Sequence, residues 1–279
     1  MSEQRSARSR ALARELREKR KASGLNLHEV AAQVGISIAS LSRRETGRRM
    51  ASVTQVAALL AVYKVVGPEQ KRIMDMAEDV HTVGWWHLNR VTGTPVNELA
   101  YFESQASSIV NYSSGPVPGL LQTPAYARAV MGSFPYERTE VERRVGERMQ
   151  RQATLHRIVP PRYTAFMDEA SLRRPFGGRD AMVEQIRWLI DMAKRPEIAI
   201  RVIPFRRGSY DQSGYFSLLG FRDAPPLVFV EGSQMSGFLD DADDIDRLEQ
   251  VVASLRRIAL DSSETVEFLG KMIADHERG

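Results

Sequence analysis

The strongest constraint on the fold is a stretch beginning at Asn26 that has the pattern of two short helices joined by a glycine turn. Asn26 is a good N-cap, and Glu29, three residues later, fits the reciprocal carboxylate of a capping box. Gly35 allows the left-handed backbone of a tight turn, Ser37 caps the second helix, and Gly47 ends it. This geometry is typical of units that place a helix in the major groove of DNA.

The second helix separates its residues by face, at 100° per residue. One side carries small or weakly apolar side chains and one arginine, namely Ile38, Ala39, Ser42 and Arg43. Leu41 and Glu45 lie on the other side, toward the expected core. Small residues allow close approach to base edges, and an arginine can bond guanine with two N–H groups. The alternative is an ordinary helical hairpin of a bundle, but the two caps, the turn glycine and the basic residues that follow favour DNA reading.

Charge is distributed unevenly along the chain. The net charge is +4, yet residues 1–64 contain thirteen basic and five acidic residues, a local charge of +8, which leaves −4 for the rest. This pattern indicates a phosphate-binding domain attached to one that does not bind nucleic acid. On its own a charged stretch is weak support, since most such stretches are simply solvated surfaces.

Composition narrows the class of protein. A chain of 279 residues is long enough for two domains, and no apolar run approaches 18 residues, so we expect no membrane span. The arginine-rich N-terminus lacks the apolar segment of a signal peptide, and the chain has no cysteine, so we expect a cytoplasmic protein without disulfides or thiolate metal sites.

Catalytic and cofactor signatures are not found in the sequence. The five histidines are scattered, so we expect no metal site and no cofactor. Gly270 and Lys271 lack the upstream glycine of a phosphate-binding loop, and no pattern aims a serine at Lys194 or Lys271 for self-cleavage. We therefore expect that the protein is not an enzyme.

Helical periodicity predicts a compact all-α domain over residues 1–78. The expected helices cover residues 7–23, 27–34, 38–46, 53–63 and 68–78. A linker follows over residues 79–100, where Gly84, Gly93 and Pro95 break periodicity. The adjacent Trp85 and Trp86 in this linker are expected to anchor one domain on the next; a ligand platform is the alternative.

Residues 101–279 have the pattern of an α+β domain. Short runs rich in β-branched and aromatic residues, bounded by glycine or proline, predict strands over residues 163–167, 198–203, 215–221 and 227–230. The expected helices cover residues 102–112, 124–131, 139–157, 180–193, 243–260 and 263–275. The fold class is therefore a five-helix DNA-binding domain followed by an α+β domain.

The first domain resembles the lambda-repressor-like, or Xre-type, helix-turn-helix family. The resemblance runs through Leu16, Arg20 and Gly24 and then through the helical pair as far as Arg49. It implies a five-helix fold that binds double-stranded DNA. It also implies that Arg20 and Glu45 form an ion pair that ties the first helix to the reading helix.

The resemblance also suggests which residues approach DNA. Ile38, Ala39 and Arg43 occupy base-contacting positions, and Asn26 and Ser37 lie near phosphates. The full set of candidate DNA-binding residues is Asn26, Ser37, Ile38, Ala39, Ser40, Ser42, Arg43, Arg44, Arg48 and Arg49. Two positions depart from the family: Ile38 replaces a frequent glutamine and would contact a thymine methyl group instead. Arg44 replaces an apolar core residue and is expected to extend toward a phosphate or a dimer partner.

The rest of the chain is similar to the large C-terminal domain of actinobacterial Xre-type regulators, which include WhiJ-like, antitoxin-like developmental regulators. The blocks that carry the resemblance are Gly84-Trp85-Trp86, 103–106, 117–129, 141–145, 168–175 and 201–205, and the most specific is Pro118-Gly119-Leu120-Leu121-Gln122-Thr123. The resemblance implies that this protein, like such regulators, pairs with a small partner protein encoded nearby.

Two functions follow as expectations. The first is a cytoplasmic, sequence-specific transcription regulator that binds DNA as a homodimer, with a C-terminal domain that dimerises and senses a protein partner or a small ligand. The second is an antitoxin-like protein whose main role is to bind a small partner, with DNA binding serving autoregulation.

Overall fold

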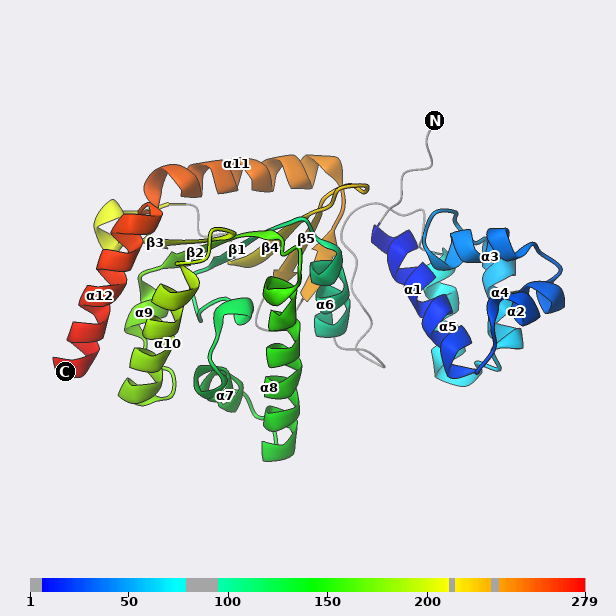
Figure 1. Ribbon diagram of the computed structural model, residues 1–279, viewed down its shortest axis with the longest axis horizontal. Helices are drawn as coiled ribbons and strands as arrows, with labels where there is room; N and C mark the ends of the chain where they lie inside the picture. Colours follow the sequence, from blue (N-terminus) through cyan, green and yellow to red (C-terminus); the bar gives the residue numbers. More distant parts are fainter. Residues whose placement is uncertain (1–6, 79–94, 211–213, 232–235, 279) are drawn as a thin grey trace.

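The computed structural model describes residues 7–78, 95–210, 214–231 and 236–278. Residues 7–78 form five helices, and the later ranges form an α+β region built on a six-stranded mixed sheet (Figure 1). The expected fold class is therefore confirmed. The five helices are α1 (Ala7–Ala22), α2 (Leu27–Val34), α3 (Ile38–Glu45), α4 (Val53–Val62) and α5 (Gly67–Glu78).

A single apolar cluster holds the five helices together. Leu12 and Leu16, one turn apart on α1, are buried against Val56, Leu59 and Leu60 of α4. Each such leucine contributes about 1.5–3 kcal/mol by leaving water. The apolar side chains that recur at helical spacing on α1 and α4 are therefore the ones that the fold buries.

The sheet of the α+β region has the order β3-β2-β1-β4-β5-β6. Strands β1, β2 and β3 are parallel, whereas β4 pairs antiparallel with β1 and leads into antiparallel β5 and β6. The strands are β1 (Ser108–Ser113), β2 (Arg162–Asp168), β3 (Ile198–Ile203), β4 (Tyr215–Gly220), β5 (Leu227–Glu231) and β6 (Ser236–Leu239). Because β1–β3 are parallel, their carboxyl ends lie at one edge of the sheet.

Helices cover both faces of the sheet (Figure 1). One face packs against α11 (Ala242–Ile258) through a cluster that includes Tyr112, Phe166 and Phe216. The other face packs against α6, α8, α10 and α12. The remaining elements are α6 (Pro95–Gln105), η2 (Gly119–Leu121), α7 (Pro124–Gly132), α8 (Arg138–Gln152), η3 (Ala153–His156), α9 (Ala170–Arg173), α10 (Gly178–Met192), η4 (Phe205–Arg207) and α12 (Ser262–Arg278).

Two expected elements differ from the structure. A helix over residues 102–112 is wrong: α6 ends at Gln105, and Ser108–Ser113 is the central strand β1. Ile109, Val110 and Tyr112 are β-branched or aromatic residues buried on both faces of the sheet, so long-range pairing overrides the local helical pattern. The expected helix over residues 139–157 is α8 followed by the short 3-10 turn η3.

The linker expected over residues 79–100 lies largely outside the described residues, and so do Trp85 and Trp86. Helix α6 begins at Pro95, inside that span. No helix in the described ranges combines the length and the apolar composition that a membrane crossing requires.

Helix α1 contacts the α+β region directly. Ala7 and Ala11 belong to the same apolar cluster as Phe102 of α6. The guanidinium of Arg10 lies over the Phe221 ring, 4.1 Å from its centroid. The Arg14 Nη1 atom lies 3.0 Å from Oε2 of the buried Glu98 on α6. Helix α1 therefore belongs to the five-helix domain and also contacts the α+β region.

We expect this contact to weaken as pH rises. Burial raises the pKa of Glu98 to about 7; Glu15 and Glu18 act in the same direction, and Arg14 and Arg72 oppose it. Once the contact opens, the carboxyl returns toward its ordinary pKa near 4.5. The closed contact therefore binds more protons, so its stabilisation is complete below about pH 4.5 and is lost as pH rises through about 7.

Fluorescence energy transfer between dyes on K21C and Q105C measures this effect, because the natural chain has no cysteine to compete for labelling. Transfer should fall between pH 5 and pH 8, and the additional substitution Glu98→Gln should flatten the curve. An equal fall in the chain with and without Glu98→Gln would assign the pH dependence to another group.

Candidate nucleic-acid interface

Helix α2 begins as the sequence predicts. The Asn26 side chain accepts hydrogen bonds from the backbone N–H groups of His28 and Glu29, at 2.9 and 3.0 Å. The Glu29 carboxylate accepts the Asn26 N–H at 2.8 Å, which completes a capping box. The helix ends at Gly35 in the left-handed conformation, with φ 71°, so the chain can turn sharply toward α3.

Helix α3 has the two faces that the sequence predicts. Leu41 and Glu45 are buried, whereas Ile38 keeps 45% of its surface exposed although it is apolar. Ala39 and Arg43 are exposed beside it, and Ser42 is half-buried. An exposed face of small residues around one arginine can approach the base edges of a DNA groove closely.

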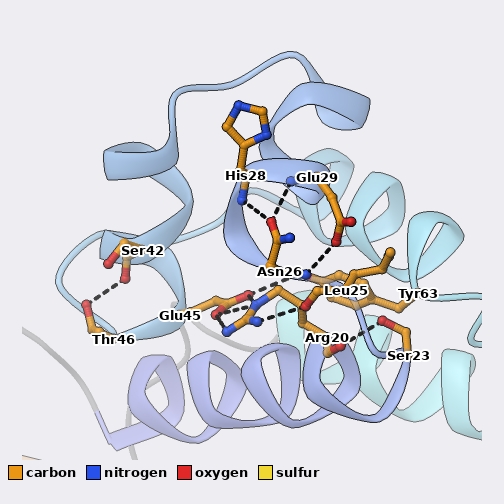
Figure 2. A network of polar contacts seen from close by, with 10 residues as sticks. All are labelled: Arg20, Ser23, Leu25, Asn26, His28, Glu29, Ser42, Glu45, Thr46 and Tyr63. Atoms are coloured by element: carbon orange, nitrogen blue, oxygen red, sulfur yellow. Dashed lines mark hydrogen bonds and ion pairs between the residues drawn. The ribbon is translucent and has the colours of Figure 1, made fainter.

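An ion pair fixes α3 against α1 (Figure 2). Arg20 Nε donates to Glu45 Oε1 at 2.8 Å, and Arg20 Nη2 donates to Glu45 Oε2 at 2.9 Å. The same guanidinium donates to the Leu25 carbonyl at 3.0 Å, and the Tyr63 hydroxyl donates to Glu45 Oε1 at 3.2 Å. Burial and the Glu45 charge raise the pKa of Tyr63, so its hydroxyl stays a donor. The network joins α1, the connection before α2, α3 and the end of α4.

Arg44 takes a different position from the other candidate residues. Only 4% of its surface is exposed. Its guanidinium donates to Gln55 Oε1 at 3.0 Å and to the Ser40 carbonyl at 3.0 Å, and it also bonds the Ser40 hydroxyl. Burial lowers the pKa of Arg44, and the charges of Arg49 and Arg43 add to this effect. The sequence suggested that Arg44 extends toward a phosphate or a dimer partner. In the structure it is buried and extends toward α4 instead.

The other candidates remain near the surface. Arg43, Arg48 and Arg49 are exposed, and within the described residues no side chain hydrogen-bonds their guanidinium groups. Asn26 and Ser37 are exposed residues whose side-chain oxygens are used as helix caps. Ser40 is half-buried because Arg44 covers it.

Sequence reasoning did not identify Gln55 and Tyr63 as supports of α3. Gln55 was detectable in principle, since it stands three residues after Ser52 and completes a second capping box with it. The bond of Tyr63 to Glu45 joins positions 18 residues apart, and no local spacing signals it.

A second polar centre lies inside the α+β region. Arg151 of α8 donates two hydrogen bonds to Glu103 of α6, at 3.0 and 2.8 Å, and both residues are buried. Close by in sequence, Arg148 donates to Gln122 Oε1 at 2.7 Å. Gln122 also donates to the Val117 carbonyl at 2.6 Å, so these contacts hold the loop between β1 and α7 against α8. Within the described ranges, no group of three histidine, aspartate or glutamate side chains could hold a metal ion.

Comparison with family models finds two matches. Residues 96–271 match a domain of unknown function (DUF5753), which covers more than half of the chain, and residues 11–72 match a helix-turn-helix domain. The second match spans α2 and α3 with their capped turn. No curated protein and no solved structure matches the chain.

Proposed function

Because the chain belongs to the DUF5753 family and carries a helix-turn-helix domain, we propose that it is a sequence-specific transcription regulator that binds DNA as a homodimer. The observation that carries the proposal is the exposed face of α3, where Ile38 and Arg43 lie open while Glu45 fixes the opposite face. Two copies would place their α3 helices in successive major grooves about 34 Å apart.

We assign the contacts by side-chain chemistry. Arg43 bonds a guanine edge, and Ile38 packs against a thymine methyl group, with Ala39 and Ser42 close to the bases. Arg48 and Arg49 bind phosphates, and Asn26 and Ser37 lie beside the backbone. Arg44 and Ser40 act as positioning residues: Arg44 donates to Gln55 of α4, which holds α3 against α4, and its bonds to Ser40 within α3 fix the guanidinium in that position.

The helix-turn-helix domain points to a regulator rather than an enzyme. We place this domain in the Xre-type, lambda-repressor-like class, and the whole chain among the actinobacterial regulators of that type. We also propose that the protein acts in the cytoplasm, where the DNA of a bacterial cell lies. We assign dimerisation and the reception of a signal to the α+β region, with α1 as the connection, because α1 contacts both regions. A signal would change DNA affinity only by binding two arrangements of the dimer unequally.

Replacing Arg43 with alanine tests the assignment of base contacts. We expect the variant to lose about 1–3 kcal/mol of discrimination between its preferred site and one with the contacted guanine changed, because a bidentate bond is removed. Titration of both DNA duplexes with the wild-type protein and with the variant measures the difference.

Arg48→Ala is the matched control, since it removes another exposed arginine of the same domain. We expect it to weaken all duplexes equally and to lower the slope of log affinity against log salt by about 1. If Arg43→Ala behaves in the same way as Arg48→Ala, Arg43 does not read bases.

The antitoxin-like function has one supporting observation. Phe134 and Tyr136 form a stacked pair, with ring centroids 5.6 Å apart, and both remain exposed. An exposed aromatic pair is typical of a surface that binds a protein partner. Purification from the native host distinguishes the two functions: a small stoichiometric partner that is lost on Phe134→Ala favours the antitoxin, and a homodimer without partner favours the regulator.

A further inference from the structure

A cavity of about 310 Å³ opens at the edge of the sheet where the three parallel strands end. Ser114 follows β1, Asp168 is the last residue of β2, and Phe205 follows β3. Gly208 and Tyr210, which lie between β3 and β4 in the chain, also line the cavity. In open sheets with parallel strands, ligands bind in the crevice outside the carboxyl ends of the strands. The size falls within the range of pockets for small molecules.

A chain of hydrogen bonds sets the polarity of this cavity. The Tyr210 hydroxyl donates to Asp168 Oδ2 at 2.6 Å, and the Ala170 N–H donates to Asp168 Oδ1 at 2.8 Å. Since the single Tyr210 proton is directed at Asp168, the contact between the Tyr112 and Tyr210 hydroxyls, at 3.0 Å, must use the Tyr112 proton. Burial raises the pKa of Tyr210, and its bond to Asp168 adds to this, so the phenol keeps its proton. The remaining lone pairs of Tyr210 and Asp168 are therefore available to accept hydrogen bonds from a ligand.

The described lining of the cavity has an acidic side chain and no basic one. Asp168 is the one carboxylate of the described lining, and only 6% of its surface is exposed. The neighbouring Glu169 is already engaged, because it accepts hydrogen bonds from Arg173 and from the Phe205 N–H. This second bond holds the chain at Phe205, a residue that lines the cavity and keeps 57% of its surface exposed.

We propose that this cavity binds a small organic cation, with a protonated amine on Asp168 and an apolar or aromatic part against Phe205. The described lining offers hydrogen-bond acceptors and a carboxylate but no basic side chain, so it disfavours anions. The exposed aromatic ring of Phe205 attracts both apolar groups and cations. The inference deepens the proposed function, on which it rests, by naming the class of signal that the α+β region receives.

Isothermal titration calorimetry with benzylammonium chloride tests the site on the full chain without DNA. We expect saturable binding of one benzylammonium per chain, and no measurable binding of benzyl alcohol or benzoate. Asp168→Asn should weaken binding by about tenfold or more, because the charge is removed while an oxygen remains for the Ala170 N–H. Phe205→Ala should weaken it as well, and since Phe205 is exposed, this variant should keep the fold.

The matched control is Asp223→Asn, an exposed aspartate of the same region that does not line the cavity. It should bind benzylammonium as the wild-type chain does. Equal weakening by all three substitutions, or no binding by the folded wild-type chain, would overturn the proposal. Because no DNA is present, a failure of DNA binding in separate titrations counts against the proposed function and leaves this result unaffected.

Discussion

Glu103→Ala should lower the free energy of unfolding of the α+β region by about 3–5 kcal/mol, because it leaves the buried Arg151 guanidinium without its partner. Two hydrogen bonds join these side chains, and burial makes an unpaired charge far more unfavourable there than at the surface. Urea unfolding followed by circular dichroism measures the change.

A double substitution separates the cost of an unpaired charge from the net value of the pair. Glu103→Leu with Arg151→Met removes both charges and keeps similar volumes, so we expect it to restore most of the lost stability. A double variant as unstable as Glu103→Ala would mean that the pair stabilises the fold by itself.

Glu45→Ala has the second large effect, in the DNA-binding domain. Glu45 accepts hydrogen bonds from Arg20 and Tyr63, so its loss leaves the buried phenol without its acceptor and leaves the partly buried guanidinium without its carboxylate, with the Leu25 carbonyl still bonded. We expect a loss of about 3 kcal/mol in the stability of the five-helix domain. Faster hydrogen exchange of the α3 amides measures it, and DNA affinity should fall in parallel because we propose α3 as the reading helix.

Glu69→Ala is the control for this experiment. Glu69 also pairs with a basic residue of α1, Lys19, but the Glu69 side chain is exposed to solvent. An exposed pair contributes about 0–1 kcal/mol, so α3 exchange should change little. If the two variants have equal effects, the Arg20–Glu45 pair has no special role in holding α3.

The sequence was most informative where local chemistry determines the backbone. The caps at Asn26 and Ser37 and the turn at Gly35 each depend on residues within four positions, and the structure contains all three. The Arg20–Glu45 pair spans 25 residues and was expected only through family resemblance. Local rules alone would not have placed it.

Prediction failed where tertiary contacts decide the outcome. Residues 108–113 form a strand because they have neighbours on both sides in the sheet, which no local window contains. Arg44 extends toward α4 because Gln55 offers an acceptor there, although the sequence neighbour Arg43 is basic and exposed. The cavity at Asp168 joins the ends of three strands and Tyr210, 42 residues further on, so its lining becomes visible only in the fold.

We propose that α3 reads DNA sequence as part of a two-fold dimer. The most direct test of this proposal is selection of binding sites by the full chain from a pool of random double-stranded oligonucleotides, followed by sequencing. We expect an enriched site with two inverted half-sites whose centres are about 10 base pairs apart, or a multiple of one helical turn. For Arg43→Ala we expect relaxed preference at one position per half-site. Retention of DNA without enrichment of any sequence would contradict it.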